Sequence, residues 1–432
     1  MIITKVNEKL SIMAQPATDE FQSFADQGFT GLINVRPDGE DEEQPGSEQE
    51  AAAAKKARMS YTFIPVTLPT VTESEVAAFQ EALDEAEGPV VAHCKSGRRA
   101  LHLYAIGEVF AGRMRRSEVQ EFGHLHGFDL TEAIAWLENH FAQRPNVRGF
   151  FDERTCSIQY VVSDPETGSC AIIDPVLDYD EKAGAIGAMN ASAILQYVME
   201  NALSVEWILD THPHADHFSA AYYLAGQTGA PIAIGDRIVE VQKIWRTIYD
   251  WPDLSADGAH WNRLFADGDT FNVGSIDARV LYSPGHTPAS VTYIIGDAVF
   301  VHDTILMPDS GTARTDFPGG DASSLWQSIQ RILALPDTTR VFTGHDYQAH
   351  GRAPRWESTV AEQKQTNIHL EGLSLEDFVK LRVEKDAQLP LPKLILHALQ
   401  VNLRAGRLPE PGSDGRPHLK IPIGAFDAAA WR

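Results

Sequence analysis

The sequence of 432 residues has only three cysteines, Cys94, Cys156 and Cys170. They are too few and too widely spaced for a disulfide framework or a CxxC zinc site, so a thiol can stay reduced and reactive. Basic residues are also scarce, because 36 Lys and Arg stand against 60 Asp and Glu and the formal net charge is -24 at pH 7. This charge would repel a phosphate backbone, which makes nucleic acid and anionic membranes poor partners.

Long hydrophobic runs are missing as well. No stretch approaches the ~20 apolar residues of a membrane span, and Met1 to Pro16 lacks the apolar core of a signal peptide. We therefore expect a cytoplasmic protein with no membrane association. Hydrophobic residues make up 43% and charged residues 22% of the chain, as in globular proteins, and 432 residues predict two or three domains.

The most informative stretch runs from Leu209 to His217, where three histidines and two aspartates directly follow an apolar run. Histidine together with aspartate is a ligand set for a borderline divalent metal. Three further motifs, at residues 284–287, 301–304 and 343–347, each follow an apolar strand candidate, the second of which covers residues 291–300. Helices are expected over residues 217–227 and 357–369. The sequence therefore predicts a metal site on loops at one sheet edge, with the candidate ligands His212, His214, Asp216, His217, His286, Asp303 and His345.

A second motif surrounds Cys94. Residues 89–93 predict a short buried strand, and Cys94 to Arg99 predicts a loop that opens a helix over Ala100 to Ala111. Backbone N–H groups, a helix N-terminus and three basic side chains would surround the thiol, and such surroundings favour a thiolate and cradle an anion. Earlier in this half, we expect a solvated acidic loop over Glu40 to Glu50 and an alanine-rich helix over residues 49–59.

The Cys94 motif resembles the dual-specificity phosphatases and the rhodanese-type sulfurtransferases. Phosphatases use HCx5R, whereas Ala100 stands six residues after Cys94 and Arg99 closes a shorter loop. A shorter loop suits a sulfur atom carried on the thiolate better than a tetrahedral phosphate. We therefore favour a sulfurtransferase with Cys94 and Arg99 as its catalytic residues, and a cysteine phosphatase is the alternative.

Written as T-H-x-H-x-D-H, the Leu209 to His217 stretch resembles the signature of the metallo-β-lactamase fold superfamily. The order of strand and helix candidates along the chain predicts an α/β protein in three parts. Residues 1–143 would form a small α/β domain like the dual-specificity phosphatases, residues 150–355 an αβ/βα sandwich, and residues 356–432 a helical extension packed on it. For the extension, substrate contacts and a homo-oligomer interface are open alternatives.

Two enzyme classes of this superfamily fit the ligands. Glyoxalase-II-like thioester hydrolases would use all seven residues to hold two zinc ions. Persulfide dioxygenases use one Fe(II), and the resemblance places it on His212, His286 and Asp303, with positions open for a persulfide and O2. The remaining four residues, His214, Asp216, His217 and His345, would then orient the ligands or bind a second metal.

Residues 311–317 resemble the G-R-T-D-F segment of persulfide dioxygenases, although Ala313 precedes the arginine. The resemblance implies that Arg314 contacts the glutathione carboxylate and that Tyr347 touches substrate. An ion pair between Arg314 and Asp316 is the other interpretation.

The whole arrangement, an HCxSGxR unit followed by a dioxygenase-like domain, resembles the bacterial β-lactamase-hydrolase-like proteins. It implies Fe(II)-dependent oxidation of glutathione persulfide, or another low-molecular-weight persulfide, to sulfite by O2, coupled to sulfur transfer at Cys94. Zinc is a substitute for iron or the metal of the alternative. That alternative is a dinuclear-zinc thioester hydrolase with a cysteine phosphatase domain.

Overall fold

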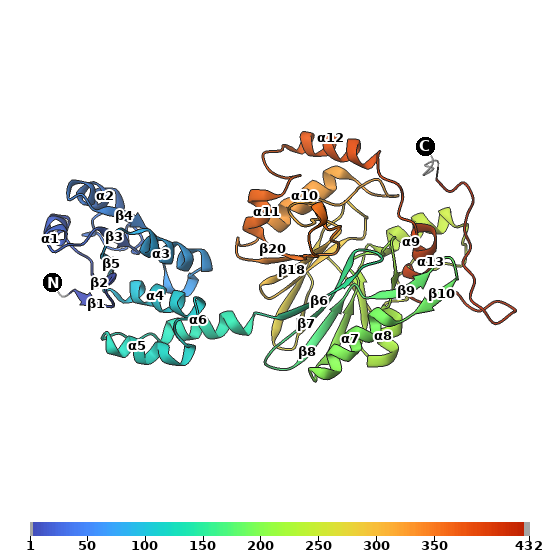
Figure 1. The fold of residues 1–432 in the computed structure, drawn as a ribbon, viewed down its shortest axis with the longest axis horizontal. Coiled ribbons are helices and arrows are strands. Elements are labelled where there is room, and N and C mark those ends of the chain that lie inside the picture. Colours follow the sequence, from blue (N-terminus) through green and yellow to red (C-terminus); the bar gives the residue numbers. More distant parts are fainter. Residues whose placement is uncertain (1–2, 427–432) are drawn as a thin grey trace. The chain divides into compact units, whose positions relative to one another are not determined.

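The computed structural model describes residues 3–426, and its contacts divide the chain into two compact units, Met1–Phe141 and Ala142–Arg432 (Figure 1). The C-terminal residues 356–426 belong to the second unit. The α/β fold class is confirmed in both units. None of the helices within residues 3–426 is long and apolar enough to cross a membrane.

The first unit is built on a five-stranded sheet in the order β1-β2-β5-β3-β4. All neighbouring strands are parallel except the β1–β2 pair. The strands are β1 (Thr4–Lys5), β2 (Leu10–Ala14), β3 (Gly31–Asn34), β4 (Ser60–Phe63) and β5 (Val90–Cys94). The helices are α1 (Phe21–Asp26), α2 (Ser47–Lys56), α3 (Glu73–Glu85), α4 (Arg98–Phe110), α5 (Val119–Leu125) and α6 (Thr131–Ala142), with short 3-10 turns η1 (Thr18–Glu20), η2 (Leu68–Thr70) and η3 (Arg116–Glu118).

Strand β5 is central in this sheet and every one of its residues is buried. A continuous apolar run is what a parallel strand covered on both faces requires. The strand ends at Cys94, so the cysteine lies at the carboxyl edge of the sheet, directly before α4. This confirms the strand, loop and helix predicted around Cys94.

The prediction of a solvated loop over Glu40 to Glu50 is wrong at its end. Helix α2 begins at Ser47, and Glu50 on its inner face is fully buried. Its carboxylate accepts hydrogen bonds from Asn34 Nδ2 at 2.9 Å and Tyr61 Oη at 3.1 Å, and lies 3.1 Å from His93 Nε2. A buried carboxylate needs such partners, and sequence polarity alone does not reveal them.

The second unit contains two six-stranded sheets, ordered β14-β13-β11-β8-β7-β6 and β15-β16-β17-β18-β19-β20, and a small sheet β10-β9-β12. The first contains β6 (Asn146–Asp152), β7 (Ser157–Ser163), β8 (Ser169–Ile173), β11 (Ser204–Leu209), β13 (Ile232–Gly235) and β14 (Arg263–Phe265). The second contains β15 (Thr270–Val273), β16 (Ile276–Tyr282), β17 (Val291–Ile295), β18 (Ala298–His302), β19 (Arg340–Thr343) and β20 (Glu357–Thr359). The small sheet contains β9 (Val176–Asp180), β10 (Ala185–Gly187) and β12 (Phe218–Ser219).

The helices cover the outer faces of the two large sheets, as Figure 1 shows. They are α7 (Met189–Glu200), α8 (Ala221–Thr228), α9 (Ile238–Ile248), α10 (Ala322–Leu333), α11 (Val360–Thr366), α12 (Leu375–Asp386) and α13 (Ile395–Asn402), with the turn η4 (Ala349–Gly351). Between the sheets lies a core that includes the buried rings of Tyr160, Phe265, Tyr293, Phe300 and Phe342. This is the predicted αβ/βα sandwich.

Three predicted elements of this unit differ in the structure. Residues 291–300, expected as one strand, form the hairpin β17–β18, because Gly296 with φ 56° makes a two-residue turn with Asp297. Residues 357–369, expected as one helix, begin with the edge strand β20. Residues 217–227, also expected as a helix, begin with strand β12, and α8 starts only at Ala221.

Candidate functional site

The predicted ligands come from four loops of the second unit, each at the end of a strand. Residues 210–217 follow β11, His286 follows β16, Asp303 follows β18 and His345 follows β19. Because β11 and β16 to β19 lie in the two facing sheets, their ends bring these loops together at one edge of the sandwich.

Two of the predicted histidine ligands converge on one carboxylate oxygen of a third ligand, Asp303. The Nε2 atoms of His212 and His286 lie 3.6 and 3.3 Å from Asp303 Oδ2. The ligand atoms of these three residues all lie within 4.8 Å of one another. Two imidazoles and one carboxylate on one side of a site form the set that holds non-haem Fe(II) and leaves other positions open.

Neighbouring oxygens orient the two imidazoles. The Thr211 hydroxyl donates to Asp174 Oδ2 at 2.9 Å, so it accepts from His212 Nδ1 at 3.1 Å. His286 Nδ1 donates to the Arg314 carbonyl oxygen at 2.8 Å. With Nδ1 protonated in both rings, each Nε2 presents its lone pair toward the site, which is the arrangement of metal-ligating histidines.

The other predicted ligands form an adjacent group. Ligand atoms of His214, Asp216 and His217 lie within 4.8 Å of one another. His345 Nε2 lies 3.4 Å from Asp303 Oδ1 and 3.6 Å from Asp216 Oδ2. The structure therefore gathers all seven candidates at one place, with the two oxygens of Asp303 facing different members.

The protonation states also suit a metal. Burial lowers the pKa of His212 and of His214 well below the ordinary histidine value, so both rings are neutral. Burial alone would raise the pKa of Asp303. The neighbouring His345, His302 and His286 nevertheless hold that pKa well below the ordinary carboxyl value. Among the described residues, His212 Nε2 and His217 Nε2 are buried without a hydrogen-bond partner. Neutral imidazoles with free lone pairs beside a carboxylate fit a metal ion.

Asp174 supports this group and was missed in the sequence. It follows β8, is buried, and accepts hydrogen bonds from Thr211 N at 2.7 Å and from the Thr211 hydroxyl. Its Oδ1 also lies 3.0 Å from His214 Nε2. Residues 210–217 form a loop that we call the metal loop. Asp174 therefore holds the first half of this loop in place.

Asn402, at the end of α13, fastens the second half of the metal loop and was also missed. Its Nδ2 donates to the carbonyl oxygens of His214 and His217, both at 2.7 Å, and its Oδ1 accepts from Ser219 N at 2.7 Å. The C-terminal helices, expected mainly to pack against the sheet, thus contribute to the site itself.

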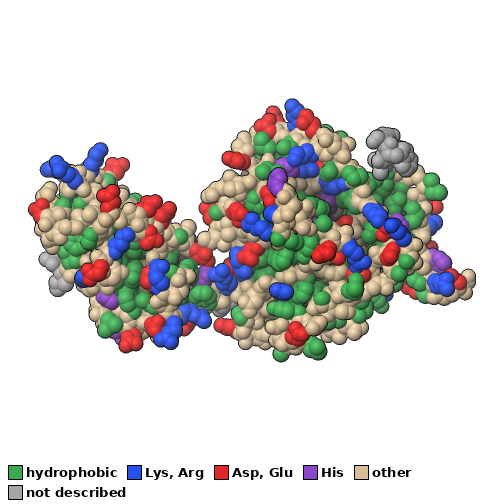
Figure 2. Space-filling model, viewed as in Figure 1, with side chains coloured by type: hydrophobic (Ala, Val, Ile, Leu, Met, Phe, Trp, Pro, Cys, Tyr) green, Lys and Arg blue, Asp and Glu red, His purple; other side chains and the backbone are tan. Residues whose placement is uncertain are grey.

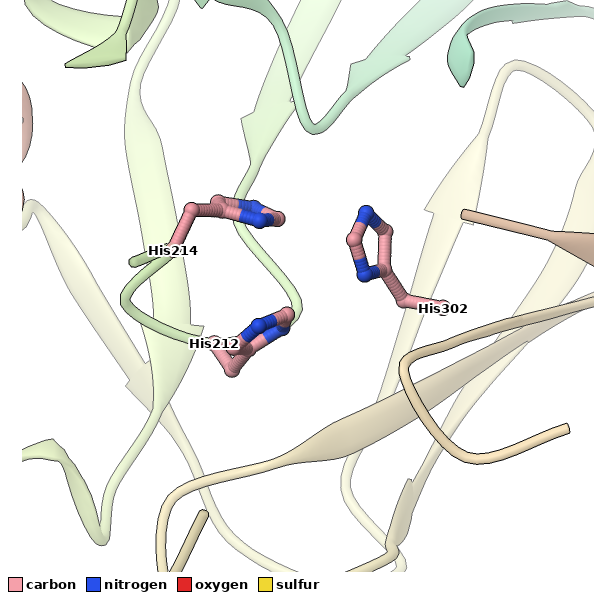
Figure 3. A group of neighbouring side chains, drawn as sticks. All are labelled: His212, His214 and His302. Atoms are coloured by element: carbon pink, nitrogen blue, oxygen red, sulfur yellow. The ribbon is translucent and has the colours of Figure 1, made fainter. Parts of the chain in front are cut away.

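His302 is the third missed residue. It precedes Asp303, and its ring projects toward His212 and His214 from the opposite strand (Figure 3). Ligand atoms of the three histidines lie within 4.8 Å of one another.

A cavity of about 1020 Å³ opens over the cluster. Its walls include His286, Asp303 and His345 and, farther out, Arg154, Arg314, Tyr347, Lys385 and Lys393. Both signs of charge line this cavity, because Arg154 and Lys393 pair with Asp178 and Glu181 of the same lining, and on the face in Figure 2 basic and acidic side chains are likewise interspersed. An anionic group of a ligand would therefore have to bind at a cation that is not already paired with a carboxylate.

The two predicted substrate contacts both line this cavity. Tyr347 is 60% exposed and its ring stacks on His345 at a centroid distance of 5.5 Å. The Arg314 guanidinium, in contrast, already donates to both oxygens of Asp316 and to the Pro390 carbonyl. The Arg314–Asp316 ion pair is therefore present, and the Arg314 backbone carbonyl orients His286.

Lys385 lies in a different environment. Its Nζ is 2.7 Å from Nε2 of the buried His369, whose Nδ1 accepts from Thr312 N at 3.0 Å. Burial, with Lys385 and Arg382 nearby, lowers the pKa of His369 to about 4. The neutral ring therefore carries its proton on Nε2, and two donors face each other. An anionic oxygen bound beside this pair would accept from both nitrogens.

In the first unit, Cys94 is a buried free thiol whose Sγ accepts a hydrogen bond from Gly97 N at 3.1 Å. Gly97 has φ 94°, and a Cβ on it would lie 3.2 Å from the Met13 carbonyl oxygen. Glycine therefore lets the loop close on the sulfur.

The arginine side chains around the Cys94 loop form ion pairs with acidic side chains. Arg99 donates to Glu40 and to the Val66 carbonyl, and Arg36 donates to Glu40 at 2.7 Å and to Asp41. Burial would raise the pKa of Glu40, but the two guanidiniums hold it below the ordinary value. Carboxylates thus already pair with the groups that a phosphate dianion would need.

Comparisons with known proteins agree with both units. Residues 3–111 match the family described as "Beta-lactamase hydrolase-like protein, phosphatase-like domain", and residues 156–345 match the metallo-beta-lactamase superfamily. The chain is 62% identical over 431 residues to a beta-lactamase hydrolase-like protein of Xylella fastidiosa, with 100% of both chains covered.

Two further relatives match the second unit. The mitochondrial persulfide dioxygenase ETHE1 of Bos taurus is 30% identical over 263 residues, which are 60% of this chain and 88% of that protein. The crystal structure of ETHE1 from Myxococcus xanthus is 32% identical and covers 61% of this chain and 100% of its own, with a TM-score of 0.49.

Proposed function

Because the chain belongs to the beta-lactamase hydrolase-like protein family, we propose that it is a bifunctional enzyme of sulfur metabolism. The second unit would oxidise glutathione persulfide with O2 and water to sulfite and glutathione. The first unit would transfer sulfane sulfur through Cys94. The similarity of the second unit to a persulfide dioxygenase supports the first activity.

One observation carries the dioxygenase proposal, namely the convergence of His212, His286 and Asp303 on a shared point. These residues would hold one Fe(II), for which zinc is a substitute. Bound Fe(II) would supply the one-electron chemistry that lets O2 react with the terminal sulfur. Arg314 and Thr211 keep the imidazoles in the ligating tautomer.

The cavity supports a persulfide carried on an anionic thiol such as glutathione. The Arg314 guanidinium is committed to Asp316, so we assign the substrate carboxylate to Lys385 and the Nε2–H of His369. A charge-assisted pair there would orient the substrate from a part of it other than the reacting sulfur. Tyr347 would cover the sulfur from the side of His345.

At Cys94, sulfur would be transferred in two steps. The thiolate attacks the terminal sulfur of glutathione persulfide, forming Cys94 persulfide and releasing glutathione thiolate. Sulfite then takes that sulfur to give thiosulfate and regenerates the thiol. Sulfite from the second unit is thus the acceptor for the first. The hydrogen bond from Gly97 N to Cys94 Sγ, directly before helix α4, supports this role.

Two experiments test the pair of activities. Anaerobically purified protein should contain iron and take up O2 when glutathione persulfide is added, and Asp303→Ala should lose both. Stoichiometric iron in the variant, or turnover indifferent to air, would contradict the dioxygenase. Cys94→Ser should abolish thiosulfate formation from persulfide and sulfite while O2 uptake stays, and an unchanged rate would contradict the transferase.

A cysteine phosphatase is the second candidate for the first unit, because the family match there is to a phosphatase-like domain. It predicts hydrolysis of an aryl phosphate that Cys94→Ser abolishes. The thioester hydrolase alternative for the second unit predicts two zinc ions and turnover of S-D-lactoylglutathione without O2.

A further inference from the structure

His302 has an unusual backbone conformation for a residue beside a metal cluster. It is the last residue of β18 and has φ 35°, in the left-handed region that side chains rarely adopt. The pairing of β18 with β19 shifts register between Phe300 and His302. Strain of this kind persists only where the surrounding structure holds the residue in place, and it clusters at functional sites.

The ring of His302 is also buried at a cost. The residue is 3% exposed, and among the described residues neither ring nitrogen has a hydrogen-bond partner. A buried polar group without a partner is unfavourable. The two ring nitrogens come only within ion-pair distance of Asp303 and Asp174, so the surrounding residues, and not well-formed hydrogen bonds, set the position of the ring.

Gly344 provides the space for this ring. A Cβ on Gly344 would lie 2.4 Å from three atoms of the His302 imidazole, far inside van der Waals contact. The glycine at the end of β19 thus forms a seat into which the ring fits. The left-handed φ of His302 and the missing side chain of Gly344 therefore both allow the His302 ring to take this position.

The ring lies beside the Oδ1 atom of Asp303, whereas His212 and His286 contact Oδ2 of the same residue. Its Nδ1 lies 3.4 Å from Asp303 Oδ1, and its Nε2 lies 3.4 Å from Asp174 Oδ2. Its centroid is 4.5 Å from that of His214 and 5.4 Å from that of His345. Figure 3 shows the ring facing His212 and His214 across the site.

This placement divides the carboxylate. Asp303 Oδ2 faces His212 and His286, whereas Oδ1 faces His302 and His345. In a two-metal centre a bridging carboxylate gives one oxygen to each ion. A second ion would therefore have to lie beside Oδ1, where the His302 ring already is.

We propose that the His302 imidazole fills the second metal position and restricts this cluster to a single ion. The inference rests on the proposed function and deepens it, because a single open ion suits a dioxygenase and a bridged pair suits a hydrolase. The opposite role for His302 is ligation of a second ion together with Asp303 and His345, whose ligand atoms also lie within 4.8 Å of it.

Metal stoichiometry of the full-length protein distinguishes the two roles. The wild type, His302→Gly and His302→Phe are saturated with zinc(II), freed of excess metal and measured by elemental analysis. Glycine relieves the strained φ and opens the space, whereas phenylalanine keeps it filled without a nitrogen. We expect one ion for the wild type and His302→Phe and two for His302→Gly. Asp216→Asn in the His302→Gly background should restore one ion.

His350→Gly is the matched control, because His350 is an exposed histidine with φ 58° outside the cluster, and it should keep one ion. His302→Ala repeats the test with a different small residue. Loaded with manganese(II), the His302→Gly protein should show the magnetic coupling of two neighbouring ions in its electron paramagnetic resonance spectrum.

Two ions in the wild type, or one ion in both His302→Gly and His302→Ala, would overturn the inference. The readout is separate from turnover. A wild type with one ion that takes up no O2 would contradict the proposed function and leave the role of His302 intact.

Discussion

Asp174 Oδ1 and His214 Nε2 lie 3.0 Å apart beneath the metal loop, and both residues are buried. The same carboxylate accepts from the Thr211 amide and hydroxyl, and through Thr211 it sets the tautomer of His212. One residue outside the predicted ligand set therefore contacts His214 and orients His212 through Thr211.

Asp174→Asn should weaken metal binding by roughly 10- to 100-fold, the usual cost of removing a group that orients a ligand. The amide can donate where the carboxylate accepts, so the Thr211 and His214 contacts cannot all be kept. Competition with a chromogenic chelator measures the change. Asp236→Asn, on the exposed Asp236–Arg237 pair, is the control and should bind metal as the wild type does. Unaltered affinity in Asp174→Asn would contradict this role.

Lys385→Ala should raise KM for glutathione persulfide by roughly tenfold and leave kcat nearly unchanged, because a charge-assisted hydrogen bond remote from the sulfur contributes to uniform binding. A persulfide whose thiol carries no carboxylate should show no such effect. Lys380→Ala, on the same helix α12 and largely exposed, is the matched control. A fall in kcat with an unaltered KM would contradict a role of Lys385 in substrate binding.

Glu40→Gln should increase the affinity of the Cys94 loop for inorganic phosphate. Removing the carboxylate frees the Arg99 and Arg36 guanidiniums that it now neutralises. A part-buried ion pair of this kind contributes on the order of 1 kcal/mol. We therefore expect phosphate to inhibit sulfur transfer at Cys94 about fivefold more tightly in the variant. Glu42→Gln, two residues on and exposed, should change nothing. If phosphate inhibits both variants equally, Glu40 does not guard the loop.

Asp164→Asn should lower stability at neutral pH and not in acid. Burial alone would raise the pKa of Asp164, but hydrogen bonds from the Ser275 and Glu166 amides and the Thr167 hydroxyl lower it from 3.8 to about 2. The folded state thus binds this proton less tightly than the unfolded chain. The stability it contributes is present above pH ~4 and is lost as the pH falls toward ~2.

At about 1.4 kcal/mol per pKa unit, the contribution is roughly 2 kcal/mol. Urea unfolding of Asp164→Asn and wild type should therefore differ by about this amount at pH 7 and converge near pH 2. The exposed Asp253→Asn should show no such difference at either pH. A gap that persists in acid would show that the effect is not the titration of Asp164.

The cluster at the sheet edge could be predicted from the sequence because its ligands are dense and each follows an apolar strand. Asp174 stands alone after β8, so no spacing marks it. Asn402 lies far along the chain from the loop that it fastens, and only the packing of α13 brings them together.

His302 was missed for a specific physical reason. Neighbouring residues of a strand point to opposite faces, so a pattern that places Asp303 in the site places His302 outside it. The register shift and the left-handed φ at His302 break that alternation. Arg314 illustrates the reverse case, because its motif predicts a substrate contact while a carboxylate two residues away takes up its guanidinium.

The bonds from Asn402 to the carbonyl oxygens of His214 and His217 also fix an order of events during synthesis. On the ribosome, the loop after β11 emerges long before residue 402 does, and until then those two carbonyls have no partner from α13. A nascent chain can thus complete its sheets while the cluster is still loose. The anchor that α13 gives to the metal loop is completed only after residue 402 has been translated.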